Sequence, residues 1–214
     1  RISGSEGGIL QEDSGASGSG MRLISSDPIL SHVTISNNTA TGEGGGMYLY
    51  YSNPTLNHVI ISNNTAYGSD DGLGDFTEIG SGGGMYLISS NPTLNHTTIL
   101  NNTADNGGGM RLDESSPILA YVTISNNTAK NGGGMGIASG SNPILTYVTI
   151  SNNMAESYGG GMRLDKSSAT LTYVTISNNT ADNAGGGIEL RGSSPTLTYV
   201  TISNNTADNE GGGM

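Results

Sequence analysis

Residues 159–184 read GGGMRLDKSSATLTYVTISNNTADNA, and most of the chain repeats this pattern. The string ISNNTA begins at Ile35, Ile61, Ile124, Ile176 and Ile202, and its variants begin at Ile99 and Ile150. Successive copies start 26, 38, 25, 26, 26 and 26 residues apart. The interval of 38 is one repeat of 26 plus 12 residues, and the extra residues lie in 67–81. The sequence therefore predicts a regular array of repeats with one inserted loop.

Apolar residues recur at every second position within short parts of the repeat. Met162 and Leu164 are two apart, as are Val174 and Ile176, and no helical spacing is sustained. Thr, Val, Ile and Tyr dominate these parts, whereas Gly, Asn, Ser and Pro separate them, so we predict two or three short strands per repeat. One repeat cannot bury its apolar side alone, and consecutive repeats must therefore stack and pair in parallel, about 4.8 Å apart.

The predicted fold is an all-β parallel β-helix (solenoid) of about seven to eight coils. It is expected to occupy residues 21–214 as a single domain, after an irregular segment or degenerate coil at residues 1–20. Equivalent residues of successive coils should form columns along the axis, as methionine does at Met21, Met47, Met85, Met110, Met135, Met162 and Met214. Ile188 takes the remaining place in that column.

A column of asparagines is predicted inside the solenoid. Continuing the alternation from Ile176 points Ser177 outward and Asn178 inward. The inward column then comprises Asn37, Asn63, Asn101, Asn126, Asn152, Asn178 and Asn204. Stacked amides can bond to one another along the axis, so we expect a buried, satisfied structural ladder. All members but Asn152 begin Asn-x-Thr sequons, and because a glycan cannot fit inside the solenoid we interpret them as structural.

These repeats resemble those of right-handed parallel β-helix proteins, the pectate-lyase-like architecture, over about residues 18–214. They are similar in particular to the passenger repeats of chlamydial polymorphic outer-membrane proteins, which are of the autotransporter type. Gly-Gly-Gly-Met stands in place of the GGA-aliphatic motif of that family, and Ile-x-x-Asn (Ile35 to Asn38) in place of its Phe-x-x-Asn motif. The resemblance implies a right-handed coil, as is usual for parallel crossovers. It implies no single activity, because this fold hosts lyases, hydrolases, adhesins and structural shells.

Composition and charge exclude several classes of function. The chain has 214 residues, no cysteine and a formal net charge of −11. Disulfide scaffolds and cysteine-ligated zinc are excluded, and the negative charge argues against binding nucleic acid. No apolar run approaches the ~20 residues of a membrane span. No capping helix is visible at either end, so we expect either a fragment of a longer chain or copies that associate end to end.

The outward residues of the first strand of each repeat form the main candidate ligand site. This glycan-binding set comprises Tyr48, Tyr50, Tyr86, Arg111, Asp113, Arg163 and Asp165. Tyrosine rings can stack on sugars and the charged groups can hold polar substituents, although a solvated face with cross-strand ion pairs explains the same residues. A lyase would need several carboxylates around calcium, but Asp113 and Asp165 are two coils, or ~10 Å, apart. We therefore predict no catalytic residue, and polysaccharide lyase or hydrolase activity is the less favoured alternative.

A column of rings is predicted at a bend of the coil. It comprises His32, His58, His96, Tyr121, Tyr147, Tyr173 and Tyr199. Three successive histidines suggest metal binding, but rings that pack edge over edge explain the column better. We predict no metal site here.

Two further features carry alternatives. The inserted loop holds Asp70, Asp71, Asp75 and Glu78, whose spacing does not match an EF-hand, so calcium is a weak candidate cofactor and we predict no other. Because loops that interrupt an array often carry specificity, this loop is our first candidate for a partner contact. Outward Thr-x-Ser pairs form a hydroxyl ladder that resembles ice-binding solenoids, although threonine also simply suits exposed strands.

Together these features predict a non-catalytic, secreted or cell-surface structural β-solenoid of bacterial type, such as an adhesin stalk or an extracellular fibre subunit. Its expected partners are other copies of itself or a host or environmental surface. Glycan binding through the outward face of the first strand is the main alternative, and ice binding is a minor one.

Overall fold

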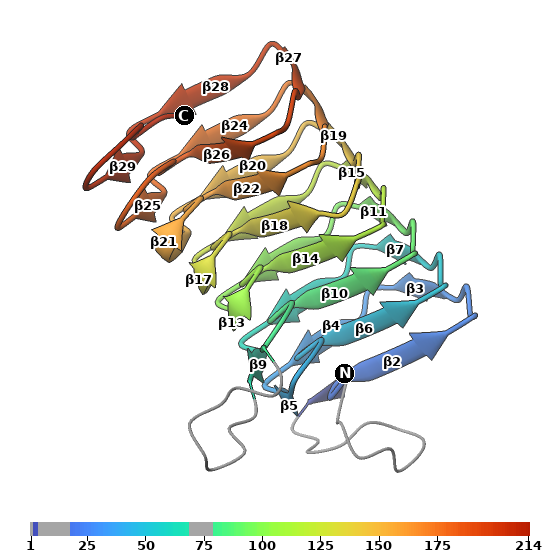
Figure 1. Cartoon of the computed structure of the whole chain (residues 1–214). Helices are drawn as coiled ribbons and strands as arrows, with labels where there is room; N and C mark the ends of the chain where they lie inside the picture. The colour runs from blue at the N-terminus through green and yellow to red at the C-terminus, as the bar shows by residue number, and fades with distance from the viewer. Residues whose placement is uncertain (1, 4–17, 69–78) are drawn as a thin grey trace.

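The computed structural model describes residues 2–3, 18–68 and 79–214. All regular elements of these residues are β-strands, and all their strand pairs are parallel. Strands one repeat apart in the sequence are neighbours in space, so the chain winds as a continuous coil from the N-terminal to the C-terminal repeats (Figure 1). This architecture confirms the predicted parallel solenoid.

Each coil contributes strands to four sheets, more than the two or three predicted strands per repeat. Sheet B contains β2 (Met21–Ile24), β6 (Met47–Tyr50), β10 (Met85–Ile88), β14 (Met110–Asp113), β18 (Met135–Ala138), β22 (Met162–Asp165) and β26 (Ile188–Arg191). Sheet C contains β3 (Ile29–Ser31), β7 (Thr55–Asn57), β11 (Thr93–Asn95), β15 (Ile118–Ala120), β19 (Ile144–Thr146), β23 (Thr170–Thr172) and β27 (Thr196–Thr198).

The other two sheets complete the coil. Sheet A contains β1 (Ile2–Ser3), β4 (Thr34–Ser36), β8 (Ile60–Ser62), β12 (Thr98–Leu100), β16 (Thr123–Ser125), β20 (Thr149–Ser151), β24 (Thr175–Ser177) and β28 (Thr201–Ser203). Sheet D contains β5 (Thr39–Thr41), β9 (Thr65–Tyr67), β13 (Thr103–Asn106), β17 (Thr128–Asn131), β21 (Met154–Tyr158), β25 (Thr180–Ala181) and β29 (Thr206–Ala207). The short strands of sheet D begin directly after the asparagine pair.

A residue with left-handed backbone stands at each of the four corners of a coil. In the coil that begins with β14 these residues are Gly107, Glu114, Tyr121 and Asn126, with φ of 65°, 51°, 54° and 56°. Such angles are uncommon outside glycine, and they recur at the same corners in the other coils. The next glycine, Gly108, is required for a different reason, because a methyl group there would collide with backbone carbonyls of the next coil.

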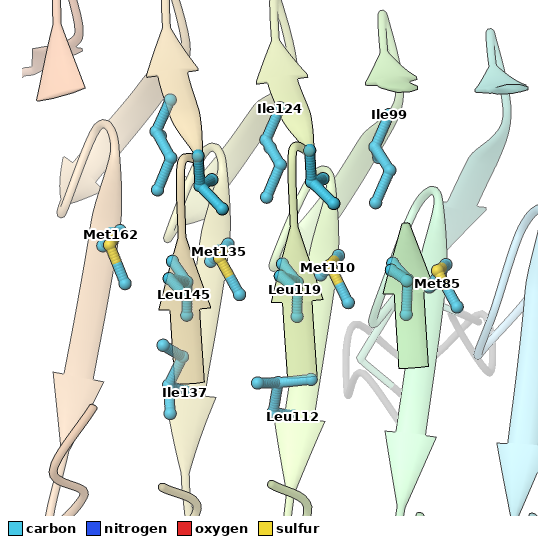
Figure 2. Close-up of a cluster of buried hydrophobic side chains, with 14 of the residues drawn as sticks. Met85, Ile99, Met110, Leu112, Leu119, Ile124, Met135, Ile137, Leu145 and Met162 are labelled. Atoms are coloured by element: carbon cyan, nitrogen blue, oxygen red, sulfur yellow. The ribbon is translucent and has the colours of Figure 1, made fainter. Parts of the chain in front are cut away.

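The predicted apolar columns fill the interior of the solenoid. Met85, Met110, Met135 and Met162 pair in register and lie in a row with no exposed surface (Figure 2). Leucine and isoleucine columns from sheets B, C and A pack against them in one continuous core. The methionine column is therefore confirmed from Met47 to Met162, with Ile188 buried in its expected place, whereas Met21 is half-buried and Met214 is 52% exposed.

The buried asparagine ladder lies one residue later than predicted. It consists of Asn38, Asn64, Asn102, Asn127, Asn153, Asn179 and Asn205, of which the first six are buried and the last is half-buried. The predicted ladder of Asn37, Asn63, Asn101, Asn126, Asn152, Asn178 and Asn204 is wrong, because all of these side chains are exposed.

The error comes from the corner between sheets A and D. The first asparagine of each pair takes the left-handed conformation, with φ between 54° and 58°. This conformation turns the chain and interrupts the alternation of a strand, so the second asparagine points inward. The same displacement removes the steric argument against glycans on the sequons, since their acceptor asparagines at this corner lie on the surface.

The true ladder is fully hydrogen-bonded along the axis. Asn127 Nδ2 donates to Asn153 Oδ1 at 3.0 Å and to the carbonyl of Ile99 at 3.1 Å. Asn127 Oδ1 accepts from the backbone N–H and from the Nδ2 of Asn102, at 2.9 and 3.0 Å. Asn64 bonds to Asn102 at 3.0 Å across the 38-residue interval. The inserted loop therefore leaves the axial ladder unbroken.

Most of the inserted loop lies outside the described residues, including the predicted partner-contact residues Asp70, Asp71, Asp75 and Glu78. The array resumes at Ser81, which forms parallel bridges with Glu43 of the preceding coil and Asn106 of the following one. In the described part of the chain, we find no helix that is long and apolar enough to cross a membrane.

Candidate functional site

The outward surface of sheet B brings the predicted glycan-binding residues together. Its first outward column runs through Arg22, Tyr48, Tyr86, Arg111, Gly136, Arg163 and Glu189. Tyr50, Asp113 and Asp165 occupy the second outward column. The expected placement is confirmed, because parallel pairing in register stacks equivalent positions.

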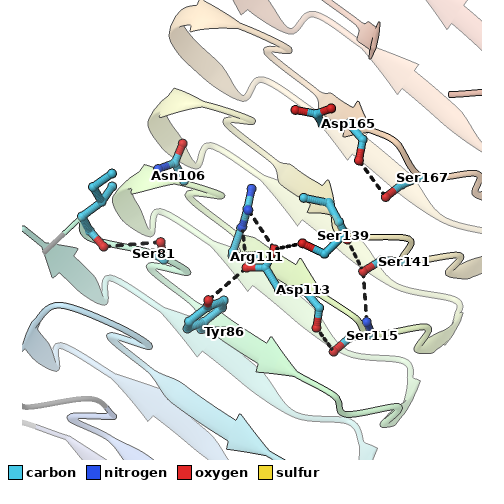
Figure 3. Close-up of polar contacts among 12 residues, drawn as sticks. Ser81, Tyr86, Asn106, Arg111, Asp113, Ser115, Ser139, Ser141, Asp165 and Ser167 are labelled. Atoms are coloured by element: carbon cyan, nitrogen blue, oxygen red, sulfur yellow. Dashed lines mark hydrogen bonds and ion pairs between the residues drawn. The ribbon is translucent and has the colours of Figure 1, made fainter. Parts of the chain in front are cut away.

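Three of these residues form a hydrogen-bonded cluster. The Tyr86 hydroxyl donates to Asp113 Oδ2 at 2.9 Å, and Arg111 donates from Nε to Oδ2 at 3.0 Å and from Nη2 to Oδ1 at 2.8 Å (Figure 3). Ser139, at the next corner, donates to Asp113 Oδ1 at 3.2 Å. Asp113 is therefore surrounded by donors of this chain and is not free to act as a base.

Burial sets the acidity of the two inner tyrosines. It raises the pKa of the Tyr86 hydroxyl far above its ordinary value, and the charges of Asp113 and Glu43 raise it further. Burial also raises the pKa of Tyr48, with a smaller contribution from Glu43 that Arg22 opposes. Both hydroxyls therefore remain neutral at physiological pH, and that of Tyr86 donates to Asp113.

A pocket opens beside this cluster, where the column has no side chain at Gly136. It has a volume of about 170 Å³ and is lined by Asn106, Arg111, Ile137, Ala138, Arg163 and Asp165. Arg163 is held from the other side by an ion pair with Glu189 at 3.1 Å. Asp165 Oδ1 is buried and has no hydrogen-bond partner among the described residues. The pocket thus presents two guanidinium groups and one acceptor that lacks a donor.

The whole array matches a known family of repeats. A model of the family described as right handed beta helix region matches residues 2–142 and 76–214, which together cover nearly the whole chain. The chain belongs to this family. The match agrees with the parallel coils of the structure and establishes their right-handed winding. No curated protein and no solved structure gives a significant match to the chain.

The tyrosines of this right-handed β-helix are less available to a ligand than the sequence analysis assumed. Tyr48 and Tyr86 are largely buried and pack edge to face, with ring centroids 5.9 Å apart. Tyr50 of sheet B is exposed, and it forms a perpendicular pair with its exposed neighbour Tyr51, with centroids 4.4 Å apart. Sequence reasoning missed Tyr51, because the corner at which it stands, with φ of 48°, was not recognised.

The carboxylates of the β-helix do not gather into a metal site within the described residues, where no group of three or more His, Asp or Glu side chains could hold an ion. Asp113 is engaged by Arg111 and Tyr86, and Asp165 lies two coils further along the axis. A calcium-dependent lyase centre therefore has no support at Asp113 or Asp165.

The predicted ring column stands on the corner between sheets C and A. Its seven rings stack face to face, with centroids 4.8 to 5.0 Å apart and interplanar angles of 3° to 20°. The expected stack of rings is confirmed, but the rings lie face to face and not edge over edge, because identical left-handed corners give every ring the same orientation as the coil repeats. Stacked imidazoles about 5 Å apart do not converge on one ion.

Proposed function

We propose that this β-helix is a non-catalytic structural solenoid, displayed outside the cell as an adhesin stalk or an extracellular fibre subunit. One observation carries the proposal: the buried asparagine ladder and the four sheets run without interruption through all seven coils. Such continuity makes a stiff rod, because each coil is held to the next by backbone bonds, side-chain bonds and core contacts.

The side chains of the candidate site add support. Arg111 and Tyr86 are engaged with Asp113, and Arg163 with Glu189, so these groups stabilise the surface of sheet B. The register between neighbouring coils is also constant in sheets A, B and C, so coils of another copy could add by the same bonds.

The extracellular location rests on the resemblance to chlamydial passenger repeats, carried by Gly-Gly-Gly-Met and Ile-x-x-Asn. Protease treatment of intact cells that express the native gene tests it: we expect loss of the protein without lysis. A protein that resists the protease until the cells are broken would refute surface display. Release of soluble sugars from a panel of plant and microbial polysaccharides would refute the non-catalytic assignment, and electron microscopy would reveal fibres.

The pocket at Gly136 favours a second function, the binding of an acidic glycan on the surface of sheet B. The unused N–H groups of Arg111 and Arg163 suit a sugar carboxylate, and Asp165 Oδ1 lacks the donor that a sugar hydroxyl would supply. A glycan array tests this function. We expect binding of uronate-containing glycans by the wild type and its loss in Arg163→Gln and Asp165→Asn. Arg191→Gln, at an exposed position on the same sheet, is the control.

A further inference from the structure

Half of the coil is free of charged residues in every repeat. The segments that form sheets C and A and the start of sheet D contain no Asp, Glu, Lys or Arg; they are residues 28–40, 54–66, 92–104, 117–129, 143–155, 169–181 and 195–207. All 7 basic and all 18 acidic residues of the chain lie elsewhere. We call the outward surface of sheets C and A, with the ring corner between them, the charge-free face.

Simple copying of a repeat does not account for this face, because its outward positions vary. The first outward residue of sheet C is Thr55 in one coil and Ile118 in another, and the last is Asn57, Ala120 or Thr172. Equivalent positions of sheet B have changed to arginine, glutamate and glycine over the same coils. Substitution has therefore occurred on sheets C and A, but only among uncharged residue types.

The charge-free face also exposes large apolar side chains. Ile118 and Ile144 of sheet C are 48% and 45% exposed, and Ile60 of sheet A is 43% exposed. The tyrosines of the ring corner stand beside them, with Tyr121 and Tyr147 about half exposed. Ile118 and Ile144 are direct neighbours in sheet C, and exposed apolar side chains that gather on one face are typical of interaction sites.

The charge distribution identifies a second copy of the chain as the occupant. The net charge of −11 makes copies repel one another wherever acidic surfaces meet. A nucleic acid or another polyanion would require basic residues on the face, and a neutral glycan would tolerate carboxylates and arginines. Exclusion of charge favours the association of two copies of an acidic protein, because like charges across an interface are costly.

Symmetry and size agree with this occupant. A two-fold axis places the face against itself, so one set of residues serves both copies. Seven coils about 4.8 Å apart and two three-residue strands with their corner give a face of roughly 30 by 20 Å. That is at most about 600 Å² per copy, because the two sheets meet at the ring corner, and about 1,200 Å² for the pair is the lower end of specific interfaces. We propose that two copies of this β-helix associate side by side through the charge-free face, which goes beyond the structural role proposed above.

Sedimentation equilibrium of the whole chain tests the proposal. We expect a concentration-dependent dimer whose dissociation constant rises by roughly tenfold or more in the double variant Ile118→Lys/Ile144→Lys. Ile24→Lys is the matched control, because Ile24 is also exposed, at 44%, but lies on sheet B. Added salt should leave the dimer intact or strengthen it, because it screens repulsion and there are no ion pairs to weaken. If the double variant does not fold by circular dichroism, Ile60→Lys on sheet A replaces it.

Several results would overturn the proposal. A wild type that stays monomeric up to its highest soluble concentration would do so, as would equal weakening by Ile24→Lys. End-to-end fibres that persist in the double variant, without dimers, would assign association to strand edges instead. A monomeric wild type that binds a neutral polysaccharide or ice through this face would replace the second copy as occupant. None of these results depends on whether the protein is displayed on the cell surface.

Discussion

Replacing Asn127 by alanine should destabilise the solenoid far more than replacing its neighbour Asn126. Asn127 is buried and makes four side-chain hydrogen bonds, two donated and two accepted. Its loss removes the acceptor of two buried donors, the backbone N–H and one amide N–H of Asn102. At about 1–3 kcal/mol for each orphaned donor, the free energy of unfolding should fall by roughly 2–6 kcal/mol. That is a large part of the ~5–15 kcal/mol typical of a domain.

Asn126→Gly is the matched control for this prediction. Asn126 is exposed and its φ is 56°, a value that glycine adopts without strain. The control should therefore change the stability by less than about 1 kcal/mol. Urea denaturation followed by circular dichroism measures both variants. Hydrogen exchange adds a local signal, because the amide of Asn102 loses its acceptor only in Asn127→Ala.

The opposite order of effects would refute the reasoning. If Asn126→Gly were the more damaging change, the first asparagine of each pair would be the buried one, as the strand alternation alone predicts. An unchanged exchange rate at the amide of Asn102 in Asn127→Ala would show that the bond to Asn127 Oδ1 does not protect it.

Three further predictions concern single positions, each measured by urea denaturation. Gly108→Ala should abolish folding or lower the free energy of unfolding by more than ~3 kcal/mol. Gly140→Ala, the control, should lower it by about 1 kcal/mol, because the added methyl group would meet open space and only the φ of 75° opposes the substitution. Equal losses would contradict the close approach of coils at Gly108. Tyr86→Phe should lose about 1–2 kcal/mol with the bond to Asp113. The pKa of Tyr86 is raised only in the folded state, so above about pH 10 the unfolded chain loses this proton first and the wild type should lose stability. Tyr86→Phe should lose less stability over the same pH range. Identical alkaline profiles for the two proteins would contradict the raised pKa of Tyr86. Thr97→Val should change the free energy of unfolding by less than ~1 kcal/mol, because Val59 and Val122 fill the equivalent buried position in the neighbouring coils. The carbonyl of Asn95, which accepts from the Thr97 hydroxyl at 3.2 Å, keeps a second donor in the backbone N–H of His58. A larger loss would show that the hydroxyl is required.

The glycine triplets recur along the chain because their glycines have structural roles. Their first member turns the corner into sheet B, as Gly107 does, and the second allows backbones of adjacent coils to approach closely. Both requirements recur from the second coil onward, so the triplet recurs with them, whereas the first coil has Ser19 in the second place. The sequon asparagines between sheets A and D recur for a similar reason, since each stands at a left-handed corner and asparagine tolerates that conformation better than most residues.

The repeat spacing by itself determined the parallel stack, the interior methionine column and the two outward columns of sheet B that contain Tyr86 and Arg111. These features follow from two periodicities, the repeat of about 26 residues and the inward–outward alternation of side chains along a strand, which together leave one way to stack the coils. Only the tertiary structure decided which asparagine is buried, that the rings stack face to face, and that Arg111 and Arg163 line a pocket at Gly136. Those features depend on corner dihedral angles and on side chains meeting between coils, and neither is encoded in the alternation within a strand.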